Sequence, residues 1–518
     1  MQNHIFNPAR LPEPSKQVVF TSGSWYEMGR QYGKQAEHGV KVKTAAGMAA
    51  VITKYKTKSH ALECLDVYLE LLKRKAPSVF ELWNGIADGA GLSREDIYLA
   101  YMNFSRLDER CSNISAWGQA TASGGMICGM NCDEHETVNY FAPVVAAWPE
   151  DGYAFISASA FTCNCVMNEK GLVLMASCGV DAREEDLAAV GLPNCLSLML
   201  CAADCETTEE ARDKIIREGL GPGSGENIHI ADAKGHAVVI EHTASYDAVR
   251  HSGDHGEKDY LLATNFFLSP QMKAANLKGD AAKKRDSSQP RYWSEEQMLL
   301  SAWGKLDLDA VNKALGCSDF YIDTARMESH MWEPSTREFT SGWNREIWKN
   351  SQGSEYQLGA WSPEIHVPFA KCVFSALMDP VNKDFYITNG CRDTLMSVNP
   401  NTTGNFMCLH LCNSVVDTVK RASEDAQIQI FLGARDMARS NKKDGERLKH
   451  LNGAKAAFLE GVNLMNLAVC EENRLEQLDL FGKSATAFCR AQCYGQLALD
   501  ESGRIFGNGD CYKKKKTF

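Results

Sequence analysis

Residues 111–133 read CSNISAWGQATASGGMICGMNCD, and the chain changes from helical to extended character within them. Apolar and polar residues alternate over 112–118 and 125–131, which is the period of half-buried β-strands. The Ser-Gly-Gly run between the two segments predicts a turn. Upstream, apolar residues recur at helical spacing to about residue 107, and no linker precedes Cys111. Cys111 therefore stands where a helical segment meets a predicted strand pair.

This placement of Cys111 suggests a nucleophile made by self-cleavage. Cutting the bond between Arg110 and Cys111 would leave a thiol beside a free α-amino group. The amine has an ordinary pKa of roughly 7.7 to 8, so it can act as the thiol's own base near neutral pH. The alternative interpretation is that Cys111 is only a buried core thiol.

The composition excludes several classes of protein. The net charge is −11 and no long basic stripe occurs, so a nucleic-acid or anionic-membrane surface is not expected. The start of the chain lacks the basic and apolar regions of an export signal, and 18 apolar residues never run together, so we expect a cytoplasmic protein. The 19 cysteines are then reduced thiols rather than disulfides. No cysteine or histidine spacing matches a zinc motif, and we predict neither a metal nor a cofactor.

The sequence pattern divides the chain into three parts. Residues 1–110 are mostly helical, with a capping box at Ser24-Trp-Tyr-Glu27 and two glycines, Gly29 and Gly33, that leave one helix face bare for close packing. Residues 111–410 contain most of the predicted strands, interrupted by helices. Residues 411–518 are helical again, and one apolar stripe at helical spacing predicts a docked helix; it comprises Ala454, Ala457, Phe458, Gly461, Val462, Met465, Ala468 and Val469.

Polar residues recur where predicted strands end or turn. They are Cys111, Asn131 with Asp133, Asn168, Asn265 and, in Ser-Gln-Pro-Arg, Arg291. Each of them alone has an ordinary structural explanation, because Asn and Asp are common in turns and loops. Their order along the chain is more informative than any single position.

In this order they resemble the N-terminal nucleophile hydrolases of the choloylglycine hydrolase, penicillin V acylase and acyl-coenzyme A:6-aminopenicillanate acyltransferase group. The stretches GSWYEMGRQYG (23–33) and GLSRED (91–96) resemble the acyltransferase branch, in which the nucleophile is internal to a self-cleaving precursor. The resemblance covers about residues 20–400. It implies an α+β fold in which two sheets form a four-layer αββα sandwich.

The resemblance also implies a role for each matching residue. Cys111 is the nucleophile, and Asp133 holds its freed amine. Asn265 and a backbone N–H near Cys178 stabilise the oxyanion, while Arg291 lowers the pKa of the thiol. Two positions depart from the bile-salt-hydrolase branch: Met130 replaces an arginine, and Cys178 replaces an asparagine. Bile-salt deconjugation is therefore not the expected reaction.

Two classes of function remain open. The first is a cysteine amidohydrolase or acyltransferase that acts on a small amide, cleaved into two pieces that stay associated. The second is a noncatalytic binding protein on the same scaffold, and a homo-oligomer is compatible with either. Five tryptophans fall where loops would cover a pocket, and they indicate either a bulky apolar substrate group or ordinary packing; they are Trp293, Trp332, Trp343, Trp348 and Trp361.

Overall fold

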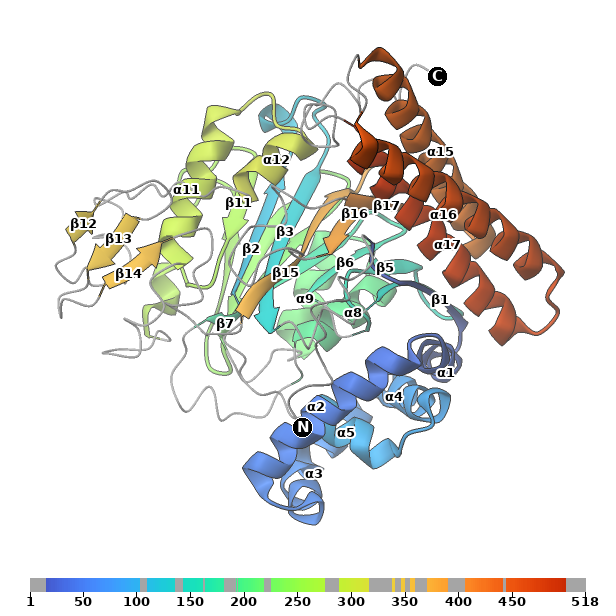
Figure 1. The fold of residues 1–518 in the computed structure, drawn as a ribbon. Coiled ribbons are helices and arrows are strands. Elements are labelled where there is room, and N and C mark those ends of the chain that lie inside the picture. Colours follow the sequence, from blue (N-terminus) through green and yellow to red (C-terminus); the bar gives the residue numbers. More distant parts are fainter. Residues whose placement is uncertain are drawn as a thin grey trace.

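The computed structural model describes residues 15–102, 110–135, 143–161, 164–180, 192, 194–218, 225–274, 288–315, 338–340, 346–349, 355–358, 370–389, 406–440 and 444–499. Its centre is a pair of stacked β-sheets with helices on both outer faces (Figure 1). No helix in these ranges is both long enough and apolar enough to cross a membrane.

The first sheet has eight strands in the order β1-β4-β5-β6-β7-β8-β9-β10. Its strands are β1 Val18–Gly23, β4 Val144–Pro149, β5 Phe155–Ser157, β6 Cys165–Asn168, β7 Val173–Val180, β8 Gly225–Ala231, β9 Ala237–His242 and β10 Asp247–His251. All neighbours pair antiparallel except β1 and β4, which are parallel. The N-terminal segment therefore contributes a strand to this sheet, which the sequence pattern did not predict.

The second sheet has six strands in the order β11-β2-β3-β15-β16-β17, all antiparallel. Its strands are β11 Tyr260–Ala263, β2 Arg110–Ala116, β3 Ile127–His135, β15 Ala370–Asp379, β16 Asp384–Asn389 and β17 Phe406–His410. The predicted strand pair of residues 112–118 and 125–131 is thus β2 and β3. A separate three-stranded sheet comprises β12 Glu338–Thr340, β13 Glu346–Lys349 and β14 Glu355–Leu358.

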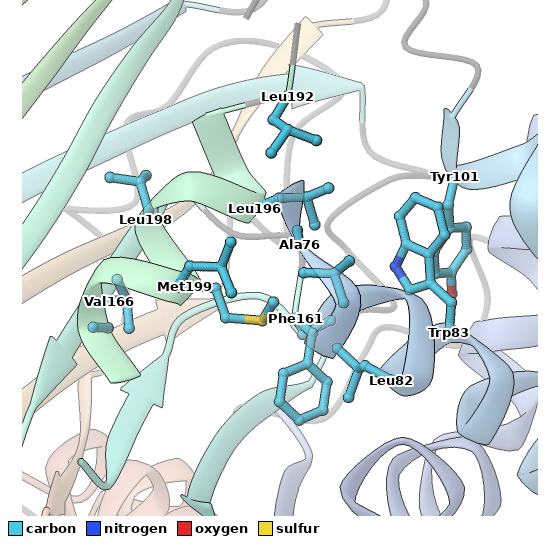
Figure 2. Packing of buried hydrophobic residues seen from close by; sticks show 14 of the residues in the cluster. Ala76, Leu82, Trp83, Tyr101, Phe161, Val166, Leu192, Leu196, Leu198 and Met199 are labelled. Carbon is cyan, nitrogen blue, oxygen red and sulfur yellow. The ribbon is translucent and has the colours of Figure 1, made fainter. Parts of the chain in front are cut away.

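Three buried apolar clusters separate four layers. The first lies between the eight-stranded sheet and the helices on its outer face, and Figure 2 shows Leu82 beside Phe161 and Trp83 beside Tyr101 within it. These helices are α1 Trp25–Gln35, α2 Glu37–Tyr55, α3 Lys58–Lys75, α4 Pro77–Ala90, α5 Arg94–Met102, α8 Asn194–Asp204 and α9 Thr208–Glu218. The second cluster fills the space between the two sheets. The third joins the six-stranded sheet to α11 Ser288–Ser301 and α12 Leu308–Leu315. The predicted αββα sandwich is confirmed.

Helices α1 and α4 approach closely because both carry glycines at their contact. A Cβ atom on Gly29 would lie 2.1 Å from the carbonyl oxygen of Leu82, and one on Gly85 would lie 2.1 Å from that of Tyr26. No side chain fits at such distances. The predicted cap is also present, since the Ser24 hydroxyl accepts a hydrogen bond from the Glu27 N–H.

Three long C-terminal helices lie beside the two sheets: α15 Val415–Arg439, α16 Gly445–Cys470 and α17 Arg474–Leu497 (Figure 1, red). Helix α17 contacts the edge strands β1 and β17, α15 contacts β17, and α16 packs on α15 and α17. Thr486 on α17 accepts a hydrogen bond from the N–H of Val18 in β1, while Gln492 accepts one from the N–H of Cys408 in β17. Side chains of α17 therefore accept hydrogen bonds from backbone N–H groups of two edge strands. The apolar stripe predicted on α16 is buried at Ala454, Ala457, Gly461 and Ala468, but Val469 is exposed.

Candidate active site

Cys111 lies near the start of β2, between β11 and β3. It is opposite Cys132 in the β2–β3 ladder, and its side chain is fully buried in the cluster between the two sheets. Alternate residues of β2 face the other way, because Ile114 and Ala116 belong to the cluster under α11 and α12. The thiol therefore points into the interior of the sandwich.

Asn265 follows β11 directly, and the pairing of β11 with β2 explains its position. Ala263 is opposite Asn113, so continuing the antiparallel register by two residues brings Asn265 opposite Cys111. The amide oxygen of Asn265 accepts a hydrogen bond of 2.9 Å from the backbone N–H of Cys111. Two of the predicted site residues are thus in direct contact.

Arg291 connects the same two residues from α11. Its Nη1 donates to the carbonyl oxygen of Cys111 at 2.8 Å and to the Ser112 hydroxyl at 2.7 Å, and its Nη2 donates to the Asn265 amide oxygen at 2.8 Å. Arg291 lies in the first turn of this helix, and Thr264 holds that turn in place by donating to the carbonyl of Ser288. The guanidinium is buried, and its planar fork spans all three acceptors.

These contacts determine which way the Asn265 amide faces. Its oxygen receives two donors, one from Cys111 and one from Arg291. The amide NH₂ therefore faces away from both donors. That group is the one able to donate to a negatively charged oxygen.

The remaining predicted residues are placed by their backbones alone. Asp133 is opposite Arg110 in the β2–β3 ladder, one residue after the partner of Cys111, but neither of these two side chains is among the described ones. Cys178 falls in β7 where the pairing with β8 shifts register between Ser177 and Val180. Such irregularities interrupt the ladder and are frequent beside active sites. The roles of Asp133, Cys178 and the Arg110–Cys111 bond stay predictions.

A polar contact between the sheets brings the Cys178 segment near Cys111. The side-chain amide of Asn113 and the Ser177 hydroxyl are 2.9 Å apart. Asn113 is two residues from Cys111 on the same face of β2, and Ser177 directly precedes Cys178 on β7. This contact places the interrupted part of β7 across from the start of β2.

Asn168 is not part of this site. Its amide oxygen accepts from the N–H groups of Lys170 and Leu172, and its Nδ2 donates to the carbonyls of Ala202 and Cys205. It therefore holds a turn and the end of α8, at the opposite end of β7 from Ser177. The structural explanation for Asn168 is the correct one.

Sequence reasoning missed one residue that supports the site. Asn227, at the β7–β8 irregularity, donates from its buried Nδ2 to the carbonyl oxygens of Thr264 at 2.6 Å and Phe266 at 2.9 Å. These carbonyls flank Asn265. Asn227 therefore fixes the backbone that carries Asn265, and its position at the start of a predicted strand carried no signal of this role.

A buried ion network supports the same loop from the other side. Arg250 lies 3.4 Å from Glu241 and 3.2 Å from Glu257, and its Nη2 donates to the carbonyl of Leu262. Glu241 accepts the backbone N–H groups of residues 268 and 269. Charges this deeply buried are stable only when paired and hydrogen-bonded. The network thus anchors the chain on both sides of Asn265.

The tryptophans predicted to border a pocket divide into two groups. Trp293 is fully buried in the cluster between α11 and the six-stranded sheet, so it is a packing residue. Trp332, Trp343 and Trp361 lie outside the described residues, as does the side chain of Trp348 on β13. No disulfide joins the cysteines that the structure describes.

Comparison with known proteins confirms the family resemblance over part of the chain. Residues 121–299 match the family model described as acyl-coenzyme A:6-aminopenicillanic acid acyl-transferase. The matched range includes Asp133, Cys178, Asn265 and Arg291 but begins after Cys111. No curated protein sequence gave a significant match.

Solved structures show a weak likeness. A conjugated bile acid hydrolase variant from Clostridium perfringens is 10% identical, with 59% of this chain and 98% of that chain covered and a TM-score of 0.29. Penicillin V acylase from Agrobacterium tumefaciens is 11% identical, with 58% and 92% covered and a TM-score of 0.30. TM-scores this low do not establish a common fold, and the layered architecture rests on the sheets and helices themselves.

Proposed function

We propose that this chain is a self-processing cysteine amidohydrolase or acyltransferase, and that Cys111 becomes its N-terminal nucleophile. One observation carries the proposal. The nitrogen that would become the α-amine is held by the Asn265 amide oxygen, and Arg291 ties the Cys111 carbonyl to the same amide. A buried backbone N–H needs a partner beside any side chain, but here the partner is a side-chain amide held by a buried arginine and not the carbonyl of a neighbouring strand. The partial family match supports the same reaction class.

Maturation is an exchange of one acyl bond for another. The Cys111 sulfur attacks the carbonyl carbon of Arg110, the C–N bond breaks, and the nitrogen takes the thiol proton to become an amine. Water then opens the thioester, leaving a carboxylate on Arg110 and a free thiol on Cys111. Asn265 is placed to accept a hydrogen from this nitrogen before and after cleavage.

Turnover uses the same groups on an external amide. The α-amine takes the thiol proton, the sulfur attacks the substrate carbonyl, and the amine then passes the proton to the leaving nitrogen. Asn265 Nδ2 and the backbone N–H near Cys178 stabilise the oxyanion. Asp133, one residue from the partner of Cys111 in the ladder, holds the α-amine. Water or an acceptor amine resolves the thioester.

The two pieces stay associated after cleavage because the first one is built into the fold. Strand β1 pairs with β4 over six residues, and α1 and α4 pack against the eight-stranded sheet. In addition, the N–H of Val18 in β1 donates to Thr486 on α17. Separating the pieces would expose this apolar surface to water, which is strongly unfavourable.

Intact mass and N-terminal sequencing of the purified protein test the proposal. We expect pieces of residues 1–110 and 111–518 that elute together under native conditions. Cys111→Ala should give folded, uncleaved and inactive protein. Cys132→Ala is the matched control, because it removes a buried thiol from the directly opposite position on β3.

Each other outcome has a definite meaning. An uncleaved wild-type chain that hydrolyses amides would overturn self-processing. An uncleaved and inert wild-type chain would favour the binding-protein alternative, which the complete burial of Cys111 also fits. If Cys111→Ala retains parental turnover, a different thiol is the nucleophile.

A further inference from the structure

A second cluster of reactive side chains lies far from Cys111. Cys408 and His410 lie on β17, and Asp425 lies on α15; all three are buried. One donor atom from each falls within 4.8 Å of the others. Four strand spacings separate β17 from β2 in the six-stranded sheet, which is roughly 19 Å. The proposed reaction at Cys111 makes no use of this cluster.

The spacing of two donor atoms matches the edge of a zinc tetrahedron. Cys408 Sγ and His410 Nε2 are 3.6 Å apart. Zinc bonds of about 2.3 Å to sulfur and 2.0–2.1 Å to nitrogen, at a tetrahedral angle, place the two ligand atoms roughly 3.6 Å apart. Asp425 Oδ2 lies 2.6 Å from the same Nε2, which is a hydrogen-bond distance. The corresponding nitrogen–oxygen edge of a zinc tetrahedron is roughly 3.4 Å, so the Asp425 side chain has to move back to become the third ligand.

A second carboxylate orients the imidazole. Asp384 on β16 pairs with His410 Nδ1, and the Tyr386 hydroxyl donates to the other oxygen of Asp384 at 3.2 Å. With a metal ion bound, this pairing would keep the proton on Nδ1 and leave Nε2 facing Cys408 and Asp425. Histidines that bind metals almost always donate their other ring N–H to a carboxylate in this way.

The backbone around Cys408 is also fixed. Gln492 on α17 accepts from its N–H at 2.8 Å and donates to its carbonyl at 3.2 Å. The alternative is an imidazolium that bridges Asp384 and Asp425, with Cys408 as an ordinary thiol of the apolar cluster beneath α11 and α12. A metal site accounts for all four side chains.

We propose that Cys408, His410 and Asp425 bind a zinc ion that fastens β17 to α15. Binding releases the thiol proton and the Nε2 proton, while Nδ1 keeps its proton on the side of Asp384. The thiolate and the Asp425 carboxylate then balance the charge of the ion. Zinc replaces the direct Nε2–Oδ2 hydrogen bond, and the fourth position falls to water or to the second Asp425 oxygen. Sequence spacing predicted no metal because the third ligand comes from a different element.

The wild-type full-length chain tests the site without any mutation. After incubation with zinc and dialysis against metal-free buffer, elemental analysis should find about one zinc per chain. Replacing zinc with Co²⁺ should produce a thiolate-to-cobalt charge-transfer band together with the visible bands of tetrahedral cobalt. Folded wild-type protein that retains no zinc and shows no thiolate band would overturn the proposal.

Variants then assign the ligands. Cys408→Ser should abolish the charge-transfer band, whereas Cys128→Ser, which alters a fully buried thiol on β3, should leave it unchanged. Asp384→Asn keeps every proposed ligand but weakens the contact that orients the His410 ring, so the Kd for zinc should rise about 10- to 100-fold. Equal zinc affinity in the wild type and in folded Cys408→Ser would overturn the proposal. If the Cys408→Ser protein binds zinc as tightly as the wild type and His236→Ala does not bind it, the zinc site is the partly exposed group of Glu209, Asp232 and His236.

Discussion

The backbone N–H of Cys111 donates to the side-chain oxygen of Asn265 at 2.9 Å, although 154 residues separate them in sequence. The contact follows from the pairing of β11 with β2 and does not depend on the Cys111 side chain. It gives Asn265 two separable functions: its oxygen can hold the nitrogen of Cys111, and its NH₂ group can donate to a substrate oxyanion.

Asn265→Asp and Asn265→Ala should separate these functions. Aspartate keeps an oxygen for Cys111 and Arg291 but has no donor, so cleavage should proceed while kcat falls. Loss of one oxyanion donor typically lowers kcat by about 10²–10³-fold. Alanine removes both functions and should slow cleavage as well. Rates of precursor cleavage and steady-state kinetics measure the two effects, and parental kcat in cleaved Asn265→Asp would exclude the oxyanion role.

Arg291→Lys should reduce turnover because one ammonium cannot replace the planar guanidinium. Arg291 contacts Cys111, Ser112 and Asn265 together. Hydrogen bonds to charged groups contribute about 1.5–3 kcal/mol each, so losing one that orients the site should lower kcat/KM by roughly 10- to 100-fold. Ser112→Ala removes only the hydroxyl contact and is the control. A larger loss in Ser112→Ala than in Arg291→Lys would show that the contacts to Cys111 and Asn265 matter little.

Asn227→Ala should impair the reaction without removing any group that touches the substrate. The variant leaves the carbonyls of Thr264 and Phe266 without this donor. A buried carbonyl that loses its hydrogen bond lowers the free energy of unfolding by about 1–3 kcal/mol. We expect kcat to fall more than KM changes, because Asn265 loses its fixed position. Asn168→Ala is a matched control, since Asn168 also holds two carbonyls but away from the site. If both variants lower stability and kcat equally, Asn227 is only structural.

Local signals in the sequence predicted much of the fold. The predicted cap at Ser24 is present, and so is the strand pair predicted for residues 112–118 and 125–131, as β2 and β3. Such features depend on a few neighbouring residues, so the sequence contains all the information they need.

Features that depend on distant partners were not predictable from the sequence. Strand β1 exists because it pairs in parallel with β4, more than a hundred residues away. Arg291 reaches Cys111 from the first turn of a helix, and not from a strand end as the polar series suggested. The carbonyl contacts of Asn227 likewise depend on how β8 lies against the end of β11. Strand pairing between remote segments leaves no local pattern in either one.

His229 makes the stability of the fold depend on pH. Burial, with a smaller contribution from the charge of Arg250, lowers the pKa of His229 to about 3. Its Nε2 lies 2.7 Å from the Ser115 hydroxyl, between the two sheets. The ring is therefore neutral in the folded protein, whereas an unfolded histidine binds a proton below about pH 6.5. Because the unfolded state binds more protons between pH 6.5 and 3, acidification through this range destabilises the fold by up to about 1.4 kcal/mol per pH unit.

His229→Gln removes this titration while keeping a polar group near Ser115. The free energy of unfolding of this variant should fall less steeply than that of the wild type as the pH drops from 6.5 toward 4. The difference in slope corresponds to at most one bound proton, or about 1.4 kcal/mol per pH unit. Urea unfolding at several pH values measures this difference. The matched variant His251→Gln alters an exposed histidine and is the control for the change of residue type. Identical slopes for wild type and His229→Gln would mean that His229 does not bind the extra proton on unfolding, and the acid sensitivity would then have to arise from another buried group.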